Sequence, residues 1–187
     1  MAESQNNVLT FGLSGKIGDL LIFRQKDGKT IVAKVAEPSK KASEKQKETR
    51  KRFQQATLYA KIATAMPETK DLYAEGAKKR RGTTAYNIAV ADFFNAPDIE
   101  MVDVSAYTGA EGDTIRVIAS DDFAVKSVHV QINNADGSLV EEGEAVHSVG
   151  NLWIYTATQR NESLDGDKIV ITASDLPGNT TTEERSL

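Results

Sequence analysis

Apolar and polar residues alternate along much of the second half of the chain. In 115–119, 128–132 and 169–173 at least every second residue is aliphatic or Ala. A period of two is typical of strands that bury one face. Turn signals built from Gly, Asp and Pro recur roughly every 8–15 residues, which favours a small antiparallel sandwich. The predicted strands lie near 99–107, 113–119, 125–133, 138–147, 152–158, 168–174 and 179–185.

The middle of the chain has helical periodicity instead. An apolar stripe begins at Phe53 and recurs at helical spacing through Tyr59 to Met66. Ser43 and Gln46 have the spacing of a capping box, and a Pro such as Pro67 suits the first position of a helix. We therefore predict helices over about 43–65, 67–79 and 85–94.

Two short apolar segments precede the helices and predict a β-hairpin. Residues 20–25 and 30–35 flank Asp27-Gly28, a dipeptide typical of tight hairpin turns. An isolated hairpin is only marginally stable in water, so a sheet, a helix or another chain has to cover it. We expect its apolar strand to offer an edge for strand addition. The residues of that predicted edge are Leu20, Leu21, Ile22 and Phe23.

The distribution of charge supports a division into two modules. Residues 1–97 hold 18 Lys and Arg against 10 Asp and Glu, a net charge of +8, whereas residues 98–187 hold 5 against 17, a net charge of −12. The total of −4 conceals this difference. The change of sign coincides with the change from helical to alternating periodicity at 95–97. We predict an α+β protein with a basic hairpin-plus-helical module, 1–97, and an acidic all-β module, 98–187.

Composition narrows the class of protein further. With 40% hydrophobic and 27% charged residues the chain has a globular composition. Its longest apolar run, 20–23, is far too short to span a bilayer, so we expect no membrane association. The N-terminus lacks the basic and apolar regions of a secretory signal, and there is no Cys. We expect a cytoplasmic location, or a place in an assembly built in the cytoplasm.

The acidic module carries phrases that resemble a known family. These are 113–122, 153–158 and the closing segment Asp175-Leu176-Pro177-Gly178-Asn179. They are similar to bacterial immunoglobulin-like repeats, which implies a β-sandwich that acts as a spacer, an adhesive domain or a decoration on a larger assembly. The N-terminal half resembles uncharacterised small bacterial proteins, and that resemblance implies no activity.

Basic residues are the candidate interaction residues. They can contact an acidic protein surface or a phosphate backbone. The alternatives are a solvated helix with ion pairs between residues three or four apart, as from Glu44 to Lys47, and cations that favour a helix C-terminus. The candidates are Lys40, Lys41, Lys45, Lys47, Arg50, Lys51, Arg52, Lys78, Lys79, Arg80 and Arg81.

Histidines and acidic residues are the remaining candidates for catalysis or metal binding. His129 and His147 lie on predicted strands without Cys partners, so we expect no zinc site and no cofactor. Trp153 is expected in the sandwich core, and Asp92 at the rim of a helical core. Acidic residues near turns can gather Ca²⁺ at one pole of the sandwich, although turn chemistry explains most of them and we predict no metal site. These residues are Asp121, Asp122, Asp165, Asp167 and Asp175.

No arrangement of residues matches a catalytic signature, so we expect neither an enzyme nor a small-molecule substrate. The leading hypothesis is a structural or interaction protein that self-assembles head to tail, or docks on another protein, through its basic module and displays the immunoglobulin-like module. The alternative hypothesis is a nucleic-acid-binding protein that uses the basic helical segments.

Overall fold

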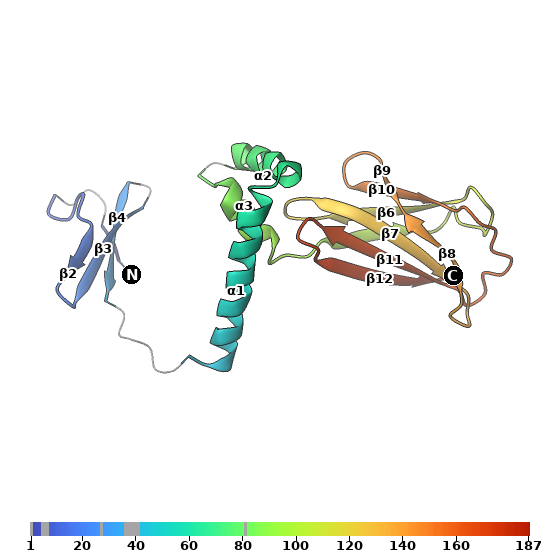
Figure 1. The fold of residues 1–187 in the computed structure, drawn as a ribbon, viewed down its shortest axis with the longest axis horizontal. Coiled ribbons are helices and arrows are strands. Elements are labelled where there is room, and N and C mark those ends of the chain that lie inside the picture. The colour runs from blue at the N-terminus through green and yellow to red at the C-terminus, as the bar shows by residue number, and fades with distance from the viewer. Residues whose placement is uncertain (1, 5–7, 27, 36–41, 81) are drawn as a thin grey trace. The chain divides into compact units, whose positions relative to one another are not determined.

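The computed structural model describes residues 2–4, 8–26, 28–35, 42–80 and 82–187. The chain divides into two compact units, 1–49 and 50–187. Over the described residues it is a mixed α+β protein whose strands form three antiparallel four-stranded sheets (Figure 1). The predicted α+β class is therefore confirmed. None of the helices in these ranges has both the length and the apolar character needed to cross a membrane.

The first unit contains a sheet in the order β1-β4-β3-β2. The predicted hairpin is confirmed as its centre, where β3 and β4 pair antiparallel with Phe23 opposite Val32. Asp27 of the predicted turn lies outside the described residues. Phe23 and Thr30 are buried in this sheet. The strands are β1 (Ala2–Ser4), β2 (Gly15–Ile17), β3 (Leu21–Lys26) and β4 (Lys29–Lys34).

The predicted pairing edge at Leu20, Leu21, Ile22 and Phe23 is wrong. The last three pair with β2 on one side and with β4 on the other, so they lie inside the sheet. Leu20 precedes β3, and its carbonyl oxygen accepts a hydrogen bond from the Val35 N–H at 3.0 Å. The glycine-rich segment before β3 forms β2, which pairs with β3 and covers its edge. β2 is only three residues long, which is too short for its sequence to show the alternation that predicts a strand. In the described part of this sheet the outer strands are β1 and β2.

Three helices follow, and local sequence signals explain where they begin. Ser43 and Gln46 form the predicted capping box before α1 (Glu44–Ala63), with reciprocal hydrogen bonds of 3.3 and 3.1 Å. Pro67 is the first residue of α2 (Pro67–Lys79), as predicted. The Thr84 hydroxyl accepts a hydrogen bond from the Asn87 N–H and caps α3 (Ala85–Asp92).

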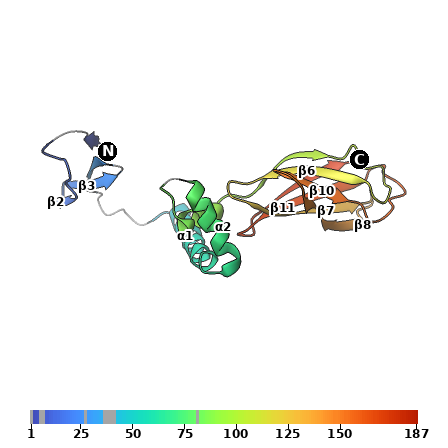
Figure 2. The ribbon, with the colours of Figure 1, turned by 90° about the horizontal axis from the view of Figure 1, so that it is seen from above.

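The two remaining sheets are formed by residues 98–187, here called the two-sheet region. One has the order β5-β6-β10-β9 and the other β12-β11-β7-β8. The predicted strands are confirmed, except that 138–147 is broken into β8 and β9. In both views the strands of the two sheets run along a similar direction (Figures 1 and 2). The strands are β5 (Asp98–Asp103), β6 (Thr114–Ser120), β7 (Val125–Asn133), β8 (Leu139–Glu144), β9 (Val146–His147), β10 (Leu152–Thr156), β11 (Lys168–Asp175) and β12 (Thr180–Ser186).

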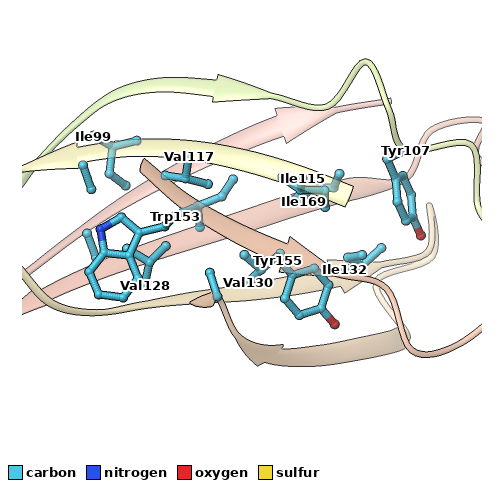
Figure 3. Packing of buried hydrophobic residues seen from close by; sticks show 14 of the residues in the cluster. Ile99, Tyr107, Ile115, Val117, Val128, Val130, Ile132, Trp153, Tyr155 and Ile169 are labelled. Carbon is cyan, nitrogen blue, oxygen red and sulfur yellow. The ribbon is translucent and has the colours of Figure 1, made fainter. Parts of the chain in front are cut away.

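Both sheets contribute to a single hydrophobic core. Val117 of β6 and Trp153 of β10 come from one sheet, while Val130 of β7 and Ile171 of β11 come from the other. Figure 3 shows the labelled side chains of this cluster gathered between the strands. The expectation that Trp153 belongs to the core is confirmed, since it is 8% exposed. Alternation along the strands therefore reports correctly which side chains face inward.

The helices pack on one another and on loops of the two-sheet region. Ala60, Tyr73 and Ile88, one from each helix, are buried in one cluster. Phe123, between β6 and β7, and Leu176, after β11, pack against the same cluster. The Tyr73 and Phe123 rings are stacked, with their centroids 4.6 Å apart. α2, α3 and most of α1 therefore share the compact unit 50–187 with both sheets, and the predicted boundary at residue 97 lies inside that unit.

Candidate functional site

Large apolar side chains on the N-terminal unit face solvent. Val8 is 91% exposed, Phe11 76% and Leu20 72%, and Ile17 on the outer strand β2 is more than half exposed. We call these four residues the N-terminal apolar surface. The segment that carries Val8 and Phe11 is held in place, because the Thr30 hydroxyl donates to the Thr10 carbonyl oxygen at 3.1 Å. These exposed side chains therefore project from an anchored segment.

The basic residues of α1 fall into two groups. The Lys47 ammonium pairs with Glu44 at 2.7 Å, as predicted, and the Arg52 guanidinium donates to the Phe94 carbonyl oxygen and lies over the Phe94 ring. Lys45, Arg50 and Lys51 are exposed, and within the described ranges no carboxylate lies at ion-pair distance from them. Lys40 and Lys41 lie outside the described residues. Lys47 and Arg52 therefore interact with other groups of the protein, whereas Lys45, Arg50 and Lys51 remain available to a partner.

The second basic cluster is also divided. Lys78 and Lys79 are exposed in the last turn of α2, where cations are favoured by the helix dipole. The Arg80 guanidinium donates a hydrogen bond to the backbone carbonyl of Asp122, in the loop between β6 and β7. Arg81 lies outside the described residues. Arg80 therefore has a structural role in joining α2 to this loop.

Three carboxylates meet where the helices contact the two-sheet region. Asp92 comes from the end of α3, Asp121 from the loop after β6, and Asp175 from the end of β11. One carboxylate oxygen from each lies within 4.8 Å of the other two. Asp92 and Asp175 are completely buried, and Asp121 is partly buried. We call these three residues the carboxylate cluster.

The neighbours of the carboxylate cluster are hydrogen-bond donors. The Tyr73 hydroxyl donates to Asp92 Oδ2, so the Tyr59 hydroxyl, 2.8 Å from the Tyr73 oxygen, donates to Tyr73 in turn. Burial raises the pKa of Asp92 to about 7; the hydrogen bond from Tyr73 opposes this rise, and the negative charge of Asp121 adds to it. Burial also raises the pKa of Asp175, against the effect of its hydrogen bonds. The protein therefore holds carboxylates together at an electrostatic cost.

Sequence reasoning placed Asp92 at the rim of the helical core, and that prediction is wrong. Asp92 is buried because loops more than 25 residues away in sequence close over the end of α3, and periodicity within one helix does not report such contacts. Asp121 and Asp175 belong to the acidic residues near turns for which the sequence predicts turn chemistry and no metal site. Asp167 lies elsewhere, bound to Asn161 Nδ2 at 2.7 Å, and Asp165 is exposed. The sequence signal that could have located the carboxylate cluster was therefore the pair of Asp-containing segments at the ends of β6 and β11.

A cavity of about 220 Å³ is lined in part by Asp121, His147 and Trp153. It is smaller than the pockets of about 300–1,000 Å³ that usually bind small molecules. The His147 ring lies edge-on to Trp153 at 5.0 Å, and its Nε2 is 2.9 Å from the Gly150 carbonyl oxygen. His147 therefore takes part in packing around its own loop.

No protein-family model matches the chain, and no curated protein does either. A crystal structure of an engineered protein is similar to part of it, with 17% sequence identity and a TM-score of 0.33. The alignment covers 55% of this chain and 26% of the engineered protein, so the chain corresponds to about a quarter of that protein's length. A similarity of this degree carries no argument about function.

Proposed function

We propose that this protein is a non-enzymatic structural protein that binds further copies of itself through its N-terminal unit and presents an immunoglobulin-like domain. The observation that carries the proposal is the exposure of the N-terminal apolar surface. Burying a large aliphatic or aromatic side chain is worth about 1.5–3 kcal/mol. An N-terminal unit that exposes Val8, Phe11 and Leu20 therefore gains substantially when another surface covers it.

Charge favours another copy of the same chain as the covering partner. The N-terminal unit, 1–49, holds 9 Lys and Arg against 6 Asp and Glu, a net charge of +3, whereas residues 98–187 have a net charge of −12. A basic N-terminal unit of one copy that meets the acidic module of the next brings opposite charges together, which steers and orients association. Such a head-to-tail contact uses different surfaces on the two copies and produces a ring or a filament.

The acidic module offers a receiving surface with matching chemistry at β9. Among the described strands, β9 pairs with β10 alone and forms one edge of its sheet. Val146 and Val149 are 72% and 75% exposed beside it, and Glu144 is exposed just before it. An apolar edge with a neighbouring carboxylate complements the N-terminal apolar surface, whose unit carries a net positive charge. We propose that the N-terminal unit of one copy covers this edge of the next.

Strand order supports the immunoglobulin-like part of the proposal. Lettered along the chain as A, B, C, C′, D, E, F and G, strands β5 to β12 give sheets A-B-E-D and G-F-C-C′. The first order is that of immunoglobulin domains, and the second adds C′ to their C-F-G sheet. Trp153 lies on strand E here rather than on strand C, and there is no disulfide. The proposal therefore rests on topology and the shared core, not on family-specific residues.

Light scattering on the full-length protein tests this function. At 50 mM salt we expect masses that are multiples of the 20.3 kDa chain. At 500 mM salt we expect smaller masses, because salt screens the attraction between exposed charges. Phe11→Gln should reduce the mass at both salt concentrations, whereas Leu58→Gln, at an exposed Leu on α1, should not.

The outcomes separate self-assembly from its alternatives. A monomer at both salt concentrations contradicts the proposal. Large species that carry nucleic acid, detected by the ratio of absorbance at two wavelengths and dispersed by nuclease, would instead support the nucleic-acid hypothesis, with Lys45, Arg50 and Lys51 as its available cations. Equal effects of Phe11→Gln and Leu58→Gln would show that the N-terminal apolar surface is not the contact.

A further inference from the structure

The geometry of the carboxylate cluster suits a divalent cation. Asp92, Asp121 and Asp175 each place one oxygen within 4.8 Å of the others. Ca²⁺ binds oxygen ligands at about 2.3–2.6 Å, so two ligands of one ion lie at most about 5 Å apart. The spacing of the three oxygens is therefore in the range expected for ligands of one calcium ion.

Two carboxylate oxygens in the cluster have no hydrogen-bond partner. Asp92 Oδ1 and Asp121 Oδ1 are shut off from solvent, and within the described ranges no donor reaches either of them. The Asp92 residue as a whole has no exposed surface. Leaving a buried charged oxygen without a partner is costly, so such groups are normally paired or coordinate a metal. These two atoms therefore point to a ligand that accepts their electron pairs.

The other oxygens of the cluster are already held. Tyr73 donates to Asp92 Oδ2, and the Phe123 and Ala124 N–H groups donate to Asp121 Oδ2 at 3.0 and 2.9 Å. Donors from 178–179 hold both oxygens of Asp175 at 2.6–2.8 Å. Hydrogen bonds that orient the ligating side chains are the usual support of a metal site. The carboxylates are therefore fixed in direction before any ion arrives.

We propose that Asp92, Asp121 and Asp175 bind one calcium ion. Their donor set contains only oxygen, which selects hard cations such as Ca²⁺ over zinc or copper. Three carboxylates supply a charge of −3, and among the described residues no Lys or Arg forms an ion pair with them. Because the ligands come from α3, from the loop after β6 and from the end of β11, the ion ties the helices to the sheets. This inference does not depend on the proposed self-assembly.

Terbium luminescence and thermal unfolding of the EDTA-treated full-length protein test the proposal. Tb³⁺ occupies calcium sites and emits when a nearby tyrosine absorbs, and Tyr73 contacts Asp92 directly. We expect Tb³⁺ emission that Ca²⁺ displaces, and a Tm that rises with the logarithm of Ca²⁺ concentration. Asp92→Asn should weaken both responses at least about tenfold. Asp165→Asn removes the same charge from an exposed turn and should leave both unchanged.

Three results would overturn the proposed calcium site. Folded wild-type protein with neither Tb³⁺ emission nor a Ca²⁺-dependent Tm overturns the proposal. So does full binding by Asp92→Asn, or loss of binding in Asp165→Asn. If Asp92→Asn fails to fold by circular dichroism, Asp121→Asn replaces it, because this variant keeps the oxygen that caps the loop while it removes the charge.

Discussion

The Asn179 side chain donates a hydrogen bond to the Asn95 carbonyl oxygen at 2.8 Å, across 84 residues of sequence. The same Nδ2 lies 2.7 Å from Asp175 Oδ2 and 3.4 Å from the carbonyl oxygens of Asp92 and Phe93. One amide therefore joins the loop after β11 to the segment that leaves α3. It also adjoins the carboxylate cluster, so the join between helices and sheets depends on it.

Replacing Asn179 with Ala should lower the free energy of unfolding by about 1–3 kcal/mol, because the buried Asp175 carboxylate and the backbone carbonyls at the end of α3 lose a donor. Urea denaturation of the full-length protein measures this. Asn151→Ala, at an exposed Asn in a turn, serves as the control and should change stability by less than about 0.5 kcal/mol. Equal losses in the two variants would contradict the role assigned to Asn179.

Two glycines with the same backbone conformation should respond differently to Ala. Gly109 and Gly112 have φ of 90° and 91°, where an L-residue costs about 1–2 kcal/mol. A Cβ on Gly109 would lie 2.5 Å from the Asn161 carbonyl oxygen, whereas a Cβ on Gly112 meets nothing within 4 Å. Gly109→Ala should therefore lose at least about 1 kcal/mol more than Gly112→Ala in thermal or urea unfolding.

Asp113 should make stability depend on pH in the acid range. Hydrogen bonds from the Thr108 N–H, the Thr108 hydroxyl and the Ala110 N–H lower the pKa of Asp113. A lowered folded-state pKa contributes stability that is fully present above the unfolded-state pKa, about 3.9, and is lost as pH falls through the folded-state value. Asp113→Asn should therefore reduce Tm at pH 7, and the difference from wild type should shrink as the pH falls below about 3.9. A difference that stays constant with pH would contradict this assignment.

The exposed cations of α1 should affect association and not folding. Lys45→Gln with Lys51→Gln removes two charges that no described carboxylate pairs with, so we expect a smaller assembly at 50 mM salt and an unchanged Tm. Lys61→Gln with Lys70→Gln removes the same charge from other exposed helical positions and serves as the control. Light scattering and thermal unfolding measure both quantities. An equal loss of mass in the two double variants would indicate a general charge effect.

Local signals predicted much of this fold. The capping box of Ser43 and Gln46, Pro67 at the start of α2 and the Thr84 cap each act within a few residues, and each helix begins where its signal lies. Alternation placed the strands around Val117 and Val130 to within a few residues, because burial of one face imposes the pattern directly. Interactions between residues that are close together in the sequence were sufficient to determine these features.

Pairing and burial between distant segments required the tertiary structure. The sequence by itself determined the three helices, most of the strands, the opposite charges of the two halves and the inward side chains of the two-sheet region. Only the folded chain placed β3 between β2 and β4, and only it enclosed Asp92 with Asp121 and Asp175. The physical reason is that periodicity records which face of an element is buried, while the partner that buries it comes from anywhere along the chain.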